Sequence, residues 1–203
     1  MVKTMMNVEA KRDALATLLG EIQNYAAGRA LVPGEGNLDA GLAIVGEAPG
    51  RHEETEGRPF IGRAGQLLDE MLVEAGLDRK EVWITNLVKW RPAKRNPSHS
   101  TRPPSINELK LFTPWLWAEL RIIQPTAALC LGRASAQAVI DREIQIDRDH
   151  GYVYKLDELS AMVTYHPAYV LRFGNHKDER TWRMAVEDLR KIAGLYRSAQ
   201  GIS

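Results

Sequence analysis

The chain of 203 residues contains one cysteine, almost no net charge and no long hydrophobic run, and each scarcity excludes a class of protein. A single thiol, Cys130, cannot form an internal disulfide or a site that needs several thiolates. The 27 basic and 26 acidic residues leave a net charge of +1, so any nucleic-acid site must be a local patch. Because no segment approaches about 18 consecutive apolar residues, and Met1–Glu9 lacks an apolar signal core, we expect a cytoplasmic protein that does not associate with membranes.

What the chain does contain is a hydrophobic fraction of 44%, which suits one domain over residues 1–203, with residues 1–33 as an N-terminal helix and arm. Short apolar runs predict buried strands at Gly41–Val45, Val82–Thr85, Ala127–Leu131 and Ala161–Tyr165. Apolar residues at helical spacing predict helices at Ala10–Tyr25, Gly65–Ala75, Ser105 to near Pro125, Gly132 to near Ile140, and Asp178–Leu195. Strands that alternate with helices predict an α/β protein, a three-layer α/β/α sandwich with a central four-stranded parallel sheet.

Polar side chains follow three of the predicted strands, namely Glu47, Asn86 and His166. In parallel sheets the ligand site gathers outside the carboxyl ends of the strands, so we expect the three to converge. Each residue also has an ordinary interpretation: a solvated carboxylate, a turn-capping amide, and a histidine that makes a structural hydrogen bond. The shared position favours a functional role for Glu47 and His166, and it leaves both interpretations of Asn86 open.

Four motifs occur in order along the chain: Gly46–Gly50 (GEAPG), Gly57–Gly65 (GRPFIGRAG), Thr85–Pro92 (TNLVKWRP) and Tyr165–Arg172 (YHPAYVLR). Together they closely resemble family 4 uracil-DNA glycosylases, and the likeness extends from about Gly34 to the C-terminus. The resemblance implies a DNA-repair enzyme that extrudes uracil from single- or double-stranded DNA and hydrolyses its N-glycosidic bond. The expected products are free uracil and an abasic site.

The resemblance also implies a role for each motif residue in binding the base. Gly46 and Ala48 would line the base pocket, and Phe60 would stack on the extruded base. Without the flanking Pro59 and Gly62, an ordinary core aromatic would be the preferred interpretation of Phe60. An amide donates from one atom and accepts at another, so Asn86 would pair with N3–H and O4 of uracil and reject cytosine.

The residues implied for catalysis are Glu47 and His166. Cleavage builds positive charge on the sugar and negative charge on the departing base. His166 would hydrogen-bond O2 of uracil, and Glu47 would either position the attacking water or stabilise the oxocarbenium-like sugar. Leu171 and Arg172 would enter the duplex as a wedge, with the alternative that Leu171 belongs to the core.

Residues 87–107 contain no Asp or Glu, and basic side chains alternate there with prolines. The predicted irregular loop carries Lys89, Arg91, Lys94, Arg95 and Arg102. We interpret it as a DNA-binding segment that tracks the phosphate backbone, with an affinity that falls as salt rises. The alternative is a solvated proline-rich loop without a partner.

The sequence departs from the family where most members bind a four-iron cluster through four cysteines. Trp90 and Phe112 stand at two of those places, and Tyr25–Val32 contains no cysteine. One buried thiol cannot supply four ligands, so we expect no iron–sulfur cluster, no metal and no other cofactor. We expect Trp90 and Phe112 to fill the space with apolar surface and to touch each other.

Three other interpretations compete with this hypothesis. Some relatives crosslink to DNA through a histidine in a basic loop, but the lysine- and arginine-rich stretch and the glutamine that accompany it are missing around His99 and at Ala48. A catalytically weak module that recognises uracil or abasic DNA remains an alternative. A phosphate-cradling loop at Gly46–Gly50 is disfavoured, because Pro49 lacks a backbone donor.

We expect the protein to act as a monomer.

Overall fold

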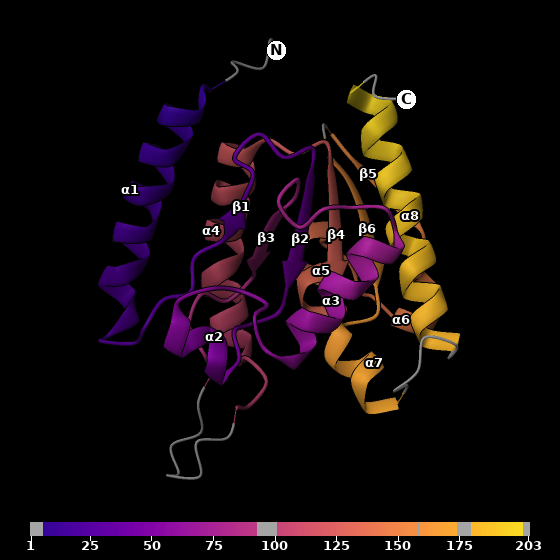
Figure 1. Ribbon diagram of the computed structural model, residues 1–203. Coiled ribbons are helices and arrows are strands. Elements are labelled where there is room, and N and C mark those ends of the chain that lie inside the picture. The colour runs from indigo at the N-terminus through magenta and orange to yellow at the C-terminus, as the bar shows by residue number, and fades with distance from the viewer. Residues whose placement is uncertain (1–5, 93–100, 158, 174–179, 201–203) are drawn as a thin grey trace.

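The computed structural model describes residues 6–92, 101–157, 159–173 and 180–200, and these form one six-stranded sheet between two layers of helices (Figure 1). The strands are β1 (Glu35–Gly36), β2 (Leu42–Gly46), β3 (Trp83–Asn86), β4 (Ala127–Leu131), β5 (Val153–Leu156) and β6 (Leu159–Thr164). Their spatial order is β1-β3-β2-β4-β6-β5. The predicted α/β/α sandwich is confirmed, and its parallel strands are the central β3, β2, β4 and β6. The predicted strand count is wrong, because β1 and β5 add an antiparallel strand at each edge.

Helices cover both faces of the sheet and bury the strands between two hydrophobic cores. One layer contains α1 (Val8–Ala26), α4 (Ile106–Ile123) and α5 (Arg133–Ile140), and the other contains α3 (Arg63–Glu74) and α8 (Arg180–Gln200). Alternate residues of β2 point into different cores, with Ala43 on the α1 side and Ile44 on the α3 side. Burial on both faces explains why the parallel strands read as continuous apolar runs.

Three short helices lie near the edge where the parallel strands end: α2 (Arg51–Glu56), α6 (Ile146–Asp149) and α7 (Pro167–Phe173). In the view of Figure 1, α2 and α7 lie below the strands, and they follow directly the loops that leave β2 and β6. Within the described ranges, no helix is both long and apolar enough to cross a bilayer. The carboxyl edge of the sheet is therefore bordered by short elements, whose loops carry the candidate site.

The predicted start of α4 is confirmed in detail. The Ser105 hydroxyl accepts a hydrogen bond from the Glu108 backbone N–H (3.2 Å), and the Glu108 carboxylate accepts one from the Ser105 N–H (2.8 Å). This capping box satisfies two donors at the exposed helix end. The helix ends at Ile123, and its C-cap Gln124 adopts a left-handed conformation before Pro125.

Candidate active site

Adjacent strands bring Glu47 and Asn86 together. Gly46 and Asn86 are register partners at the ends of β2 and β3. Hydrogen bonds continue beyond the strand ends, from Leu87 N to the Gly46 carbonyl (2.9 Å) and from Val88 N to the Glu47 carbonyl (3.0 Å). The backbone thus fixes the acid and the amide on neighbouring segments at the carboxyl edge.

His166 reaches the same edge from β6, on the far side of β4. Gly132 N donates to the Thr164 carbonyl (2.9 Å), which ties the end of β4 to the segment before His166. A Cβ at Gly132 would lie 3.5 Å from Cβ of His166, so the imidazole packs over this turn. His166 and Glu47 line one cavity of about 280 Å³, together with Leu131, Gly132, Arg133, Ile146, Asp147, Tyr165 and Tyr169.

Gly46, Phe60 and Asn86 form a tightly packed group beside this cavity, which we call the Gly46 cluster. A Cβ at Gly46 would overlap both the Asn86 amide oxygen and the Phe60 ring. The Phe60 ring lies 5.9 Å from the His166 ring between centroids, which links the cluster to the cavity. Ala48, which was also expected in the base pocket, is half-buried in the loop after Glu47.

The amide of Asn86 has an unsatisfied acceptor. Asn86 is 2% exposed, and within the described part of the chain its Oδ1 accepts no hydrogen bond. A buried polar atom without a partner costs about 1–3 kcal/mol, so such atoms tend to mark strained or ligand-binding positions. An occupant that presents an N–H group to Oδ1 would remove this penalty.

The surroundings of His166 fix its protonation state. Burial lowers the pKa of His166 to about 4, against the opposing charge of Glu53, so the ring is neutral at neutral pH. The Ala168 backbone N–H donates to Nδ1 (3.1 Å), which places the remaining proton on Nε2. The neutral ring therefore offers an Nε2–H donor to the site.

Glu47 lies in an environment that disfavours its charge. Burial raises the pKa of Glu47, and the nearby Arg133 guanidinium only partly offsets the effect. A poorly solvated carboxylate interacts strongly with positive charge that develops beside it. The sequence analysis did not predict Arg133 as a site residue. It follows β4, however, and the rule that locates sites at the carboxyl ends of strands could have identified it.

The prediction that Lys89 contacts DNA is wrong. Lys89 is 1% exposed, and its ammonium donates to the Asn86 carbonyl (2.7 Å) and forms a buried ion pair with Glu119. Glu119 also accepts a hydrogen bond from the Trp83 indole N–H (3.0 Å). An ammonium in the core cannot reach a phosphate, and Lys89 instead supports the segment that carries Asn86.

Arg91 does not face solvent as the predicted DNA-binding loop requires. It is 8% exposed, and its Nε donates to Glu54 of α2 (2.7 Å). Arg102 is more accessible, with 35% of its side chain exposed, and it forms a two-pronged ion pair with Glu108 (2.6 and 2.9 Å). Lys94 and Arg95, like His99, lie outside the described residues.

The predicted wedge residues lie on α7, immediately after His166. Leu171 is half-buried and Arg172 is exposed. An exposed cation and a partly accessible apolar side chain on one short helix beside the cavity suit a surface that meets DNA.

The residues present do not fit an iron–sulfur cluster. The rings of Trp90 and Phe112 are in edge-to-face contact with centroids 4.5 Å apart, so their predicted contact is confirmed. Trp115 continues the stack 5.3 Å from Phe112, and Arg29 of the arm lies 4.7 Å above Trp90. Cys130 lies buried in β4, where burial raises the pKa of its thiol. The described residues include no group of three or more His, Cys, Asp or Glu side chains placed to hold a metal ion.

Comparison with known proteins decides the family. The profile of the uracil DNA glycosylase superfamily matches residues 33–190, which contain the whole candidate site. The chain belongs to the uracil-DNA glycosylase superfamily. A Type-4 uracil-DNA glycosylase from Archaeoglobus fulgidus is 41% identical over 148 residues, 69% of this chain and 71% of the relative. The Type-4 enzymes of Thermotoga maritima (36%, covering 79% and 80%) and Sulfurisphaera tokodaii (39%, covering 81% and 74%) are similarly related.

The close packing around Gly46 predicts how a larger side chain at this position would affect uracil binding. Gly46→Ala should abolish measurable inhibition of uracil release by free uracil, because the added methyl group overlaps the Asn86 amide oxygen and the Phe60 ring and must displace them. Overpacking should lower the free energy of unfolding by about 1–3 kcal/mol, so the protein should still fold. The control is Gly20→Ala on α1, where a Cβ meets nothing within 4 Å. Unchanged inhibition by uracil in Gly46→Ala would show that the Gly46 cluster does not bind the base.

Proposed function

We propose that the protein is a uracil-DNA glycosylase that hydrolyses the N-glycosidic bond of uracil in single- or double-stranded DNA, without a metal or other cofactor. The observation that carries this proposal is the buried, unpaired Oδ1 of Asn86 beside Phe60 and next to the cavity of Glu47 and His166. The Type-4 uracil-DNA glycosylases among its relatives support the same substrate.

Recognition requires the nucleotide to leave the base stack, at a cost of a few kcal/mol, and to enter the pocket. Phe60 stacks on the extruded ring. Oδ1 of Asn86 accepts from N3–H of uracil, and the amide nitrogen donates to O4. Cytosine presents an acceptor at N3 and a donor at C4, so the fixed amide would meet like groups at both positions.

Cleavage of the glycosidic bond then builds positive charge on the sugar and negative charge on the departing base. As the bond between N1 and the sugar breaks, its electron pair stays with uracil, and O2 becomes more negative. Nε2–H of the neutral His166 donates to this oxygen, while the carboxylate of Glu47 lies near the positive sugar. Water adds to the sugar carbon and loses a proton, and the uracil anion takes up a proton from solvent, which leaves an abasic site and free uracil.

We assign contact with the DNA strand to α7 and to basic residues of the segment between β3 and α4. We assign the wedge to Leu171 and Arg172, and phosphate contacts to Arg102 and to Lys94 and Arg95. We further propose that the protein acts as a monomer in the cytoplasm. Binding should weaken as salt concentration rises, because phosphate contacts release counterions.

The substitution Asn86→Asp tests whether the amide of Asn86 recognises uracil. A carboxylate cannot donate to O4 and repels it, so the enzyme concentration that half-saturates single-turnover uracil release should rise by about tenfold or more. The matched control is Asn37→Asp, because Asn37 uses its oxygen to accept from the Asp39 N–H (2.9 Å) and a carboxylate can do the same. If Asn86→Asp saturates like the unmodified protein, Asn86 does not read the base.

A further inference from the structure

The backbone of Phe60 adopts a conformation that large side chains rarely occupy. Its φ angle is +53°, in the left-handed region. For a bulky residue this region costs about 1–3 kcal/mol and persists only where the surroundings enforce it. Phe60 lies in the loop that joins α2 to α3, and it is 5% exposed. Something in the fold must therefore hold this turn.

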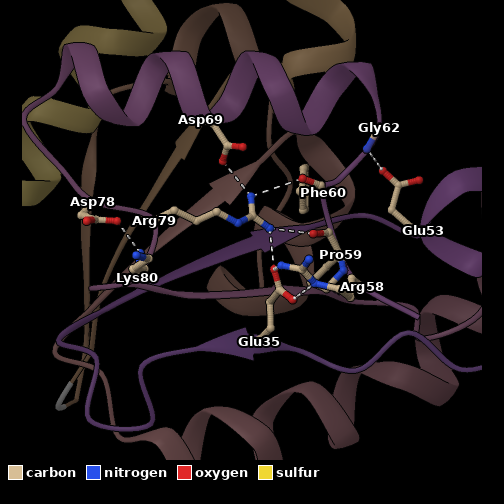
Figure 2. A network of polar contacts seen from close by, with 10 residues as sticks. All are labelled: Glu35, Glu53, Arg58, Pro59, Phe60, Gly62, Asp69, Asp78, Arg79 and Lys80. Carbon is tan, nitrogen blue, oxygen red and sulfur yellow. Dashed lines mark hydrogen bonds and ion pairs between the residues drawn. The ribbon is translucent and has the colours of Figure 1, made fainter. Parts of the chain in front are cut away.

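Arg79 supplies hydrogen bonds to the turn from the segment between α3 and β3. Its guanidinium donates to the Pro59 carbonyl (2.7 Å) and to the Phe60 carbonyl (3.2 Å) (Figure 2). The planar guanidinium has five N–H donors in a rigid arrangement, so one side chain can fix two successive carbonyl groups. The two peptide groups that flank Cα of Phe60 end in these carbonyls, and together they set the direction of its ring.

Two carboxylates hold the guanidinium of Arg79 in place. Asp69 of α3 and Glu35 of β1 each lie 2.8 Å from an Arg79 nitrogen, as Figure 2 shows. Burial acts to raise the pKa of Glu35, but hydrogen bonds from Arg58 and Arg79 outweigh it, so the pKa is lowered and the carboxylate stays charged. Arg79 thus binds the Phe60 turn to two separate elements of the sheet and helix layers.

The far side of the loop is fixed independently of Arg79. Glu53 of α2 accepts a hydrogen bond from Gly62 N (3.0 Å). A Cβ at Gly65 would overlap the Phe60 carbonyl, so the start of α3 packs directly against the turn. The loop should remain folded without Arg79, while the direction of the Phe60 ring loses its support.

We propose that Arg79 is a positioning residue that acts through Phe60, by holding the turn so that the aromatic ring lies flat against the extruded base. This inference rests on the proposed function, because it requires Phe60 to stack on uracil. Arg79 itself touches neither base nor sugar in this scheme.

The test is a double-mutant cycle measured by single-turnover uracil release at saturating enzyme. Arg79→Ala should lower the rate by about 10- to 10²-fold, the loss typical of a reacting group displaced by about 1 Å. Phe60→Ala should lower it at least as much. In the Phe60→Ala background, Arg79→Ala should cause less than about a twofold further loss, because the ring it positions is gone.

Two further variants serve as controls. Arg58 pairs with the same Glu35 (2.8 Å), but among the hydrogen bonds of the described residues it donates to neither the Pro59 nor the Phe60 carbonyl, so Arg58→Ala should change the rate by less than about twofold. Arg79→Lys keeps a positive charge near Glu35 and Asp69 but cannot fix both carbonyls, so its rate should lie between those of the unmodified protein and Arg79→Ala. If Arg79→Ala does not fold, as judged by thermal unfolding, the cycle is run with Arg79→Lys.

The outcomes separate this inference from the proposed function. If the full loss caused by Arg79→Ala persists in the Phe60→Ala background, Arg79 acts by another route and the inference is overturned, while the proposed function stands. If Phe60→Ala alone keeps the normal rate, the stacking role fails and the inference fails with it.

Discussion

Replacement of His166 by alanine is expected to lower the single-turnover rate of uracil release by about 10²–10³-fold, the loss seen when one transition-state donor is removed. The structure holds this imidazole neutral, since burial lowers its pKa to about 4, and the Ala168 N–H occupies Nδ1. A neutral donor suits a weakly basic leaving group such as the uracil anion, because it stabilises the charge without transferring a proton early. Alanine removes the donor and leaves the pocket walls in place.

The matched control for this variant is His52→Ala. His52 is exposed on α2, away from the cavity lining, and its removal should leave the rate unchanged within about twofold. The half-saturating enzyme concentration of His166→Ala should change little, because the interaction strengthens only in the transition state. A near-normal rate for His166→Ala would exclude His166 from the chemical step.

Glu47→Gln should reduce the rate to a comparable extent, by about 10²–10³-fold, and should also change its pH dependence. Burial raises the pKa of Glu47, so in the unmodified protein the rate should fall as pH drops through a value above that of an ordinary glutamate. Glutamine does not titrate, and its residual rate should stay flat until His166 gains a proton near pH 4.

The stability of Glu47→Gln separates this effect from unfolding. The folded state disfavours the charged form of Glu47, so a neutral amide should leave the melting temperature unchanged or raise it. Glu81→Gln, at an exposed position before β3, makes the same chemical change as a control. If Glu47→Gln keeps the acid-side fall in rate, another group titrates and Glu47 does not carry the catalytic charge.

Three residues at the carboxyl edge of the sheet depart from the usual rules of burial and backbone conformation. Asn86 buries an unpaired acceptor, Glu47 is poorly solvated, and Phe60 has a left-handed backbone. Each feature lowers the stability of the folded protein, and such departures from local rules cluster at functional sites. We therefore expect binding of free uracil to raise the melting temperature, because the base would satisfy Asn86 and pack against Phe60.

The central strands and main helices were predictable because their signals are local. The apolar run Ala127–Leu131 is β4 with the same limits, and Ser105 with Glu108 defined the start of α4. The placement of Glu47, Asn86 and His166 at one edge followed from parallel strand order, which periodicity and connection length already imply.

The edge strands were missed because their residues carry no such signal. β1 has two residues, one of them Gly36, and β5 is mostly half-buried and includes the exposed Lys155. Strands of this kind are defined by pairing with a neighbour and not by their own hydrophobic pattern. The helices α2 and α7 were likewise too short for a periodic stripe.

Lys89 shows a different limit of sequence analysis. Its basic, proline-rich neighbours indicated solvent and DNA, whereas its partner Glu119 lies 30 residues further along the chain on the facing helix. Arg79 is a similar case, because its acceptors at Pro59 and Phe60 lie about 20 residues before it. Burial of a charge depends on such distant partners, and no local pattern reveals them.

The most direct measurement of the central claim is base release by the purified protein. Oligonucleotides that carry uracil, hypoxanthine, xanthine or thymine opposite guanine are incubated with excess enzyme, and free base and abasic sites are quantified. The account predicts that uracil is released in a single turnover and that thymine, whose methyl group must fit the closely packed cluster of Gly46, Phe60 and Asn86, is released far more slowly. Tight binding of the uracil-containing strand without any release of base would contradict it and would identify the protein as a module that only recognises uracil.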